Sequence, residues 1–195
     1  MFRLHLMAWV LLVIVCLSRA EANTPLAVIP QPSQVTQSAG HFVIKPDTCI
    51  LASEGTRDVA EQLVDTLAPA LGYRLKVLDV YDPFVNAILL SLRPSLVGYG
   101  DEEYRLQVTD KNITILVATP AGLFYGVQTL RQLLPAAIFS DQPIAKIAWQ
   151  VPAVSIEDRP RFRWRGMHLD VARHFMPKAF IKETKSTSTC SPYTR

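Results

Sequence analysis

Cysteine is scarce in this chain of 195 residues. Three cysteines are present, Cys16, Cys49 and Cys190, and Cys16 lies in an apolar N-terminal run that we expect to be removed. The other two can form at most one bridge, which excludes the disulfide framework that stabilises many small exported domains. The stability of the fold must therefore come from a hydrophobic core.

An excess of charge of one sign is also lacking. The chain has 20 Lys and Arg against 17 Asp and Glu, a formal net charge of +3, and the basic residues are scattered. Nucleic-acid-binding domains typically gather basic residues on one face or stripe, so we expect no nucleic-acid partner. Hydrophobic residues make up 49% of the chain and charged residues 19%, which is enough apolar material for a globular core.

The first 22 residues have the pattern of a secretory signal peptide. Arg3 and His5 precede an unbroken apolar run from Leu6 to Leu17, and a small-x-small cleavage pattern follows at residues 20–22. The run is short for a bilayer span, so we predict export to the periplasm or the exterior without a stable membrane anchor. A retained anchor is the alternative; a lipoprotein modified at Cys16 is another, against which the bulky Val15 counts.

Two helices are predicted within residues 23–158. The first lies between Thr56, as its cap, and Gly72; Pro69 near its end predicts a kink or an early stop. Its apolar stripe consists of Val59, Leu63, Leu67 and Leu71. The second starts with Thr119 as cap and Pro120 in the first turn, and it ends before Pro135. Gly122 and Gly126 on it predict close packing of the helix on a sheet.

Short β-like runs separate these helices, at residues 41–44, 49–52, 74–79, 87–92, 104–109, 113–118 and 146–156. Residues 110–112 are rich in turn formers and join two runs into an antiparallel hairpin. Because the strands do not alternate strictly with helices, we predict an α+β domain over residues 23–158. Its sheet is expected to be mostly antiparallel, with both helices on one face.

A second unit is predicted to begin at residue 159, after the Glu157-Asp158-Arg159-Pro160 boundary. Met167, Leu169 and Val171 alternate with polar residues, which is the period of a strand. Only twenty residues follow Phe175, too few to bury such a strand in a domain of normal size. We therefore interpret residues 159–182 as the start of a larger domain that this sequence does not complete.

Two groups of polar residues are candidates for a catalytic or metal site. Asp101, Glu102 and Glu103 form an acidic run, which we interpret as a solvated loop because it lies in a Gly-rich stretch just before a predicted strand, with no pocket-forming partner nearby in the sequence. His168, Asp170 and His174 could suggest a metal site, but no further cluster of His or Cys follows them. We therefore predict no metal and no cofactor.

Several stretches resemble a known family. They are Arg159-Pro160-Arg161-Phe162, Trp164-Arg165-Gly166, Leu169-Asp170-Val171-Ala172-Arg173-His174-Phe175, Glu103-Tyr104-Arg105-Leu106 and Thr119-Pro120-Ala121-Gly122-Leu123-Phe124-Tyr125-Gly126-Val127-Gln128-Thr129-Leu130. The first three resemble the start of the catalytic barrel of the β-N-acetylhexosaminidases, glycoside hydrolase family 20. The last two resemble its small accessory domain. The resemblance covers residues 25–182 and implies a truncated (β/α)8 barrel after the α+β domain.

The resemblance implies an exo-acting hydrolase that removes terminal N-acetylglucosamine or N-acetylgalactosamine from an oligosaccharide or glycoconjugate with retention of configuration. In that family, the Glu of an adjacent Asp-Glu pair protonates the glycosidic oxygen, and its Asp orients the acetamido group that attacks the anomeric carbon. The pair lies beyond the first barrel strand, so no catalytic residue is assigned here and the chain alone is expected to be inactive. The alternative is a non-catalytic accessory domain that binds carbohydrate or a partner protein.

The resemblance also assigns one binding residue. Arg165 matches the family arginine that holds hydroxyls of the terminal sugar, a task that suits the fixed fork of donors on a guanidinium. Barrel enzymes, however, place their sites at the carboxyl ends of strands, which would favour Arg173 or His174. We therefore predict substrate binding for Arg165, as the resemblance implies, and structural hydrogen bonds for Arg173 and His174.

The family pattern is lost after Lys182. Residues 183–195 are rich in Ser and Thr, contain Pro192 and show no helical periodicity. We predict an aberrant, disordered tail produced by a shifted reading frame or a wrongly assigned end.

Overall fold

The computed structural model describes residues 26–79, 85–95, 100–162, 164–166, 170, 173 and 175–181. The predicted signal peptide and the predicted tail therefore lie outside the described residues. So does most of the predicted barrel strand, of which only Asp170 is described. No helix among the described ranges is long and apolar enough to cross a membrane.

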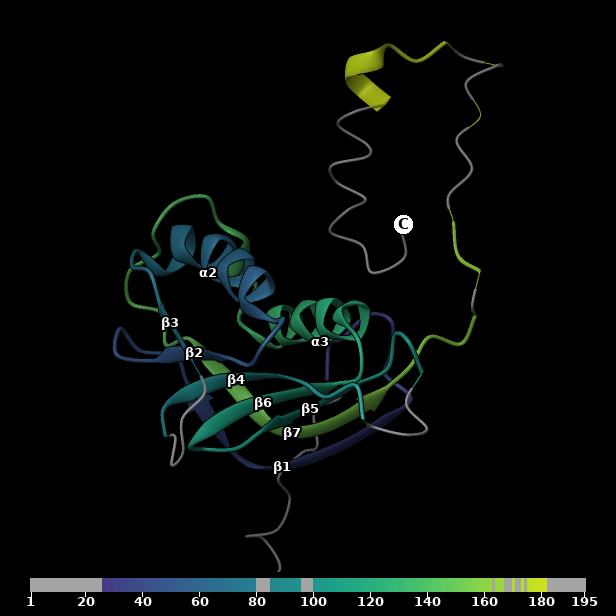
Figure 1. The fold of residues 1–195 in the computed structure, drawn as a ribbon. Coiled ribbons are helices and arrows are strands. Elements are labelled where there is room, and N and C mark those ends of the chain that lie inside the picture. Colours follow the sequence, from purple (N-terminus) through teal and green to yellow (C-terminus); the bar gives the residue numbers. More distant parts are fainter. Residues whose placement is uncertain are drawn as a thin grey trace, which may run out of the picture.

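The described chain forms a seven-stranded sheet covered by helices (Figure 1). The strands are β1 (Gln34–Val43), β2 (Cys49–Ala52), β3 (Lys76–Asp79), β4 (Ala87–Leu92), β5 (Tyr104–Val108), β6 (Asn112–Val117) and β7 (Gln150–Asp158). The helices within this unit are α2 (Arg57–Leu71), α3 (Pro120–Leu133) and the short 3-10 helix η1 (Ala136–Phe139), and one further helical turn covers residues 178–181. The sheet order is β1-β7-β5-β6-β4-β2-β3.

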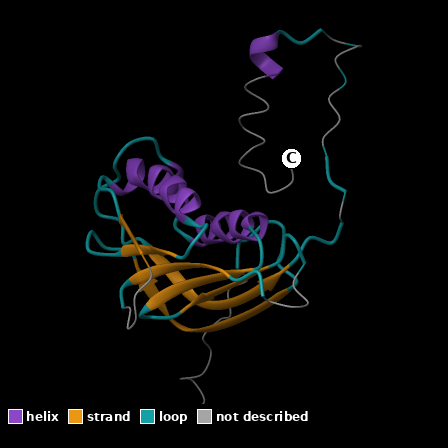
Figure 2. Cartoon of the chain, viewed as in Figure 1, coloured by secondary structure: helices purple, strands orange, loops and turns teal. Residues whose placement is uncertain are grey.

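The α+β class is confirmed, and both long helices lie on one face of the sheet (Figure 2). The expected antiparallel sheet is confirmed only in part, because it is mixed. The hairpin β5–β6 and the pairings β1–β7 and β5–β7 are antiparallel, whereas β2–β3, β2–β4 and β4–β6 are parallel. β2 and β3 are joined through α2, the connection that parallel neighbours require.

Helix α2 meets some of the expectations for its ends. Gly72 adopts a left-handed conformation with φ of 77°, and its N–H donates to the carbonyl of Ala68. Thr56 precedes the helix, but its hydroxyl donates to the carbonyl of Ser53 at 2.8 Å and makes no side-chain cap. The helix continues past Pro69 to Leu71, so the proline lies within its last turn and not at its end.

Helix α3 begins as the sequence predicts. Thr119 is extended, its hydroxyl oxygen accepts from the N–H of Gly122 at 3.2 Å, and Pro120 occupies the first turn. A Cβ at Gly126 would lie 2.6 Å from Cγ2 of Ile115 on β6, and a Cβ at Gly122 would overlap the carbonyl oxygen of Glu103. The predicted close packing of this helix on the sheet is therefore confirmed.

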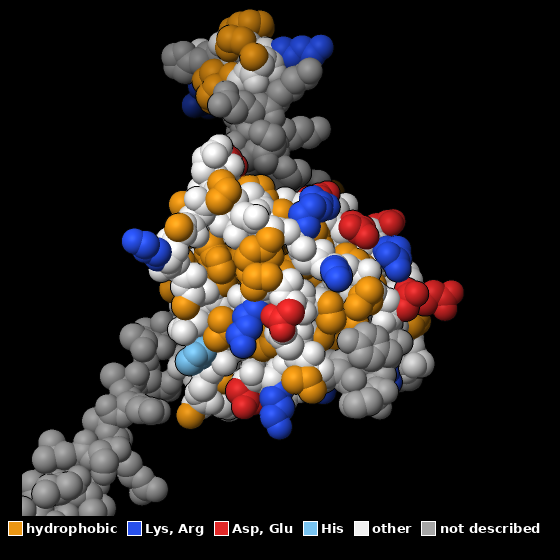
Figure 3. Space-filling model, turned by 90° about the vertical axis from the view of Figure 1, so that its left-hand side faces the viewer, with side chains coloured by type: hydrophobic (Ala, Val, Ile, Leu, Met, Phe, Trp, Pro, Cys, Tyr) orange, Lys and Arg blue, Asp and Glu red, His pale blue; other side chains and the backbone are white. Residues whose placement is uncertain are grey.

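The core lies between the helices and the sheet. Its largest fully buried side chains are Phe42, Ile50, Leu63, Leu67, Ile88, Leu90, Leu106, Ile113, Ile115, Leu123 and Leu130. Leu51 is also fully buried, in a separate small cluster with Cys49 and Ala87. Basic and acidic side chains are interspersed on the surface beside α2 and β3 (Figure 3). The close packing under α3 matters for the site, because it fixes the loop before β5 against the start of this helix.

Candidate functional site

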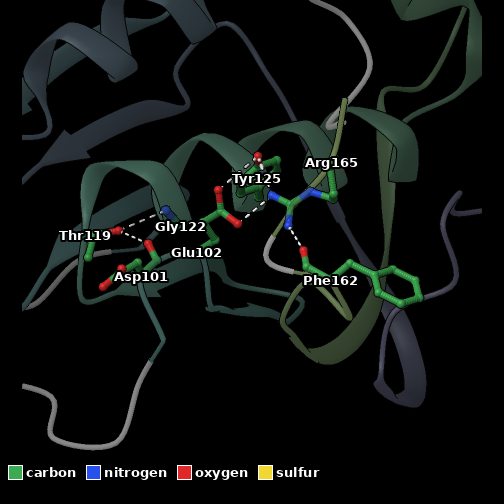
Figure 4. Close-up of polar contacts among 7 residues, drawn as sticks. All are labelled: Asp101, Glu102, Thr119, Gly122, Tyr125, Phe162 and Arg165. Carbon is green, nitrogen blue, oxygen red and sulfur yellow. Dashed lines mark hydrogen bonds and ion pairs between the residues drawn. The ribbon is translucent and has the colours of Figure 1, made fainter. Parts of the chain in front are cut away.

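Arg165 lies against the α+β domain, in a cluster with two residues of that domain (Figure 4). Its Nη2 donates to Oε2 of Glu102 at 2.5 Å and to the hydroxyl of Tyr125 at 3.1 Å. Its Nη1 donates to the carbonyl of Phe162. Its Cζ lies 5.7 Å from the centre of the Tyr125 ring, within the range of a cation–π contact.

The three side chains come from three parts of the chain. Glu102 lies in the loop before β5, Tyr125 lies on the second turn of α3, and Arg165 follows the strand β7 by seven residues. The Tyr125 hydroxyl also lies 3.5 Å from Oε1 of Glu102. The cluster therefore connects the segment after β7 to the loop before β5 and to helix α3.

The Glu102–Arg165 pair is largely shielded from water, with side chains 19% and 13% exposed. Burial of the guanidinium lowers the pKa of Arg165, but its hydrogen bonds to Glu102 and Tyr125 and the charge of Glu102 outweigh this effect and raise that pKa above its ordinary value. Arg165 is therefore a permanent cation in this site. The carboxylate of Glu102 in turn holds this positive charge in place.

The interpretation of residues 101–103 as a solvated loop is confirmed for the loop and for the exposed Asp101, but it is wrong for Glu102. Glu102 is paired with Arg165, and Oε2 of Glu103 accepts from the N–H of Gly100 at 3.1 Å. The sequence did not show this because the partner lies 63 residues away. Tyr125 was also missed; it belongs to a stretch that carries the family resemblance, but no local pattern distinguishes it from a packing residue.

A cavity of about 440 Å³ adjoins this cluster. Its walls are residues 28–31 and Ser33 of the lead-in, Tyr104 of β5, one side of α3, residues 158–162 and Arg165. Its polar groups bond mainly to one another: the hydroxyl of Tyr104 lies 2.6 Å from that of Thr129 and 3.2 Å from Oδ2 of Asp158. Oδ1 of Asp158 in turn accepts from the N–H of Ser33 at 2.9 Å.

The remaining candidates lie further along the chain. His168 and His174 are outside the described residues. Arg173, with a side chain 88% exposed, pairs with Asp170 at 3.2 Å. In the described ranges, no three His, Cys, Asp or Glu side chains gather closely enough to hold a metal ion. The sugar contact predicted for Arg165 stays a prediction, although its protein partners favour a different role.

Three comparisons relate this geometry to known proteins. Residues 26–159 match the family model for glycosyl hydrolase family 20, domain 2. A beta-hexosaminidase of Porphyromonas gingivalis is 34% identical over 164 residues, which cover 84% of this chain and 21% of that protein. The GH20 beta-N-acetylhexosaminidase of Streptomyces coelicolor A3(2) superposes with a TM-score of 0.76 at 40% identity.

A beta-hexosaminidase of Streptomyces plicatus, solved with its product GlcNAc, is similar at 39% identity and a TM-score of 0.75. Both Streptomyces matches cover 87% of this chain but only 34% of the solved one. The chain thus spans about a fifth to a third of the length of these relatives. The matched domain and its fold show that the chain belongs to glycosyl hydrolase family 20.

Proposed function

We propose that this chain supplies the accessory domain and the entry to the catalytic barrel of a β-N-acetylhexosaminidase. The observation that carries the proposal is the family match over residues 26–159 together with the coverage of only 34% of the Streptomyces coelicolor enzyme. The whole enzyme would remove terminal N-acetylglucosamine or N-acetylgalactosamine, and the Streptomyces plicatus relative with GlcNAc as its product supports that sugar class.

Apolar side chains beyond β7 support the continuation into a barrel. Phe162, Trp164 and Phe175 are 71%, 91% and 89% exposed. Removing large aromatic side chains from water lowers the free energy, and a barrel that starts near residue 167 would cover these three. The residues before the barrel strand would then link the two domains.

Catalysis belongs to the barrel and not to the α+β domain. In this chain, the adjacent Asp101 and Glu102 cannot serve as the family's catalytic pair, because Glu102 is paired with Arg165. Binding of a sugar without a proton donor or a group that orients the acetamide does not lower the barrier to hydrolysis.

Within the whole enzyme, Arg173 is the better candidate for the sugar hydroxyls. It follows the predicted strand at its carboxyl end, where barrel enzymes place their sites, and its side chain is 88% exposed. The fork of Arg165, by contrast, already donates to Glu102, Tyr125 and Phe162. This assignment revises the role that the resemblance gave to Arg165.

Export is also part of the proposal. The apolar run before residue 18 and the small residues at 20–22 support cleavage by signal peptidase and a periplasmic or secreted location. Mass spectrometry of the protein recovered from outside the cytoplasm should give a mature N-terminus at Asn23. A chain that retains residues 1–22 in the membrane would favour the anchor.

The activity test compares two proteins on an aryl N-acetyl-β-glucosaminide. One is the 195-residue chain, and the other joins its residues 1–181, which include Arg173, to the rest of the barrel of the Streptomyces coelicolor relative. We expect hydrolysis by the joined protein and none above background by the chain alone. Hydrolysis by the chain alone would contradict the division of labour, and a folded but inactive joined protein would contradict the proposed function.

A further inference from the structure

We infer that Glu102 and Tyr125 are positioning residues that clamp Arg165, and with it the segment that leads into the barrel. The consequence of these contacts for the barrel rests on the proposed function, because they would limit where the first barrel strand starts. The contacts themselves are properties of this chain. We call the cluster of Glu102, Tyr125 and Arg165 the clamp.

The half of the clamp in the α+β domain is held in place by contacts independent of Arg165. The hydroxyl of Thr119 donates to the carbonyl of Asp101, and the same oxygen accepts from the N–H of Gly122 (Figure 4). Gly122 lies so close to the carbonyl of Glu103 that a Cβ would not fit. Two backbone contacts on either side of Glu102 therefore fix the loop to the start of α3.

The guanidinium fits this arrangement in a way that other cations do not. Its Nη2 reaches the carboxylate of Glu102 and the hydroxyl of Tyr125, while Nη1 reaches the carbonyl of Phe162. A planar fork can make these contacts together, whereas an ammonium group is a point donor. The contact to Phe162 also closes the segment 162–165 on itself.

The Glu102–Arg165 pair is far more buried than the surface ion pairs of the domain. The Arg74–Asp65 pair, with side chains 61% and 65% exposed, is of the kind that contributes little to stability. The Glu102–Arg165 pair, at 19% and 13% exposed, is screened far less by water and salt. The clamp therefore gives a little-screened contact to a segment that has no strand or helix of its own between residues 159 and 162.

The position of the clamp gives it a specific consequence. Only Gly166 separates Arg165 from the predicted strand Met167–Val171, and the exposed Arg173 lies eight residues after Arg165. Fixing Arg165 to the accessory domain therefore limits where this strand can start relative to the sheet. A glutamate and a tyrosine distant from the reacting sugar would thus take part in orienting the barrel.

Limited proteolysis of the 195-residue chain tests the clamp without any activity assay. Trypsin must take the arginine side chain into its own pocket, so the bond between Arg165 and Gly166 is protected while the clamp is closed. Mass spectrometry of early digests measures cleavage after Arg165 and, as an internal reference, after the exposed Arg173. Glu102→Gln should accelerate the first cleavage about tenfold or more and leave the second unchanged.

Matched variants distinguish the clamp from general loosening. Glu103→Gln changes the adjacent carboxylate, which lies outside the clamp, and should leave cleavage after Arg165 at the wild-type rate. Tyr125→Phe keeps the ring and removes one acceptor, so it should give a smaller acceleration than Glu102→Gln.

The clamp is refuted if Glu102→Gln and the wild type are cut after Arg165 at the same rate. It is also refuted if Glu103→Gln accelerates this cleavage as much as Glu102→Gln does. Should Glu102→Gln fail to fold by circular dichroism, Tyr125→Phe decides in its place, and an unchanged rate there would refute the clamp. None of these outcomes depends on hydrolysis, so they leave the proposed function to its own test.

Discussion

Replacing Gly122 by alanine should destabilise the domain, although alanine is the better helix former. The exchange gains about 1 kcal/mol of helix propensity. A Cβ at this position would overlap the carbonyl oxygen of Glu103 and lie 3.2 Å from its carbonyl carbon. Overpacking of this kind costs about 1–3 kcal/mol. We expect a net loss of about 1–2 kcal/mol, since the obstacle is backbone that cannot rotate away.

The free energy of unfolding is to be measured by urea titration at 25 °C, followed by circular dichroism and by the fluorescence of the buried Trp149. Ala121→Gly, at the neighbouring helix position, measures the propensity alone and should cost about 0.5–1 kcal/mol. Because Gly122→Ala displaces the backbone beside Glu102, its cost and that of Glu102→Gln should not add in the double variant.

The sign of the change decides the outcome. If propensity were the larger effect, Gly122→Ala would be more stable than the wild type. Such a result, or strict additivity with Glu102→Gln, would refute the argument that this glycine is required to hold the loop against α3.

The remaining predictions concern the domain and its arginines. Residues 23–158 alone should melt cooperatively in calorimetry because the sheet and both helices lie within them; a broad, non-cooperative melt would contradict independent folding. Gly126→Ala should cost about 1–3 kcal/mol in the same urea assay because its Cβ would meet Ile115; an unchanged midpoint would refute the tight contact. In the joined enzyme, Arg173→Ala should lower kcat/KM by a factor that corresponds to about 2–4 kcal/mol of activation free energy. Arg165→Ala should mainly lower the melting temperature and have the smaller effect on kcat/KM. The reverse pattern would restore the sugar-binding role first predicted for Arg165.

The sequence predicted the elements of this fold better than their pairing. The stripe of α2, the cap and proline of α3 and the β5–β6 hairpin are local patterns, and each is found. The parallel pairings were missed because β2 and β4 are short apolar runs, which suit a strand covered on both faces but do not specify a neighbour's direction. The pairing of Glu102 with Arg165 was missed because the two residues lie 63 positions apart and only the tertiary structure brings them together.

The place of β7 in the sheet has a consequence for biosynthesis. This strand lies between β1 and β5, so the first strand finds its hydrogen-bonding neighbour only when the last strand has been made: Gln34 pairs with Glu157. A chain emerging from the ribosome cannot close its sheet before that residue is available, and such distant pairings make folding slow. Export machinery that needs an unfolded chain would benefit from this delay. A product ending before residue 150 would leave the edge of β5 open to aggregation.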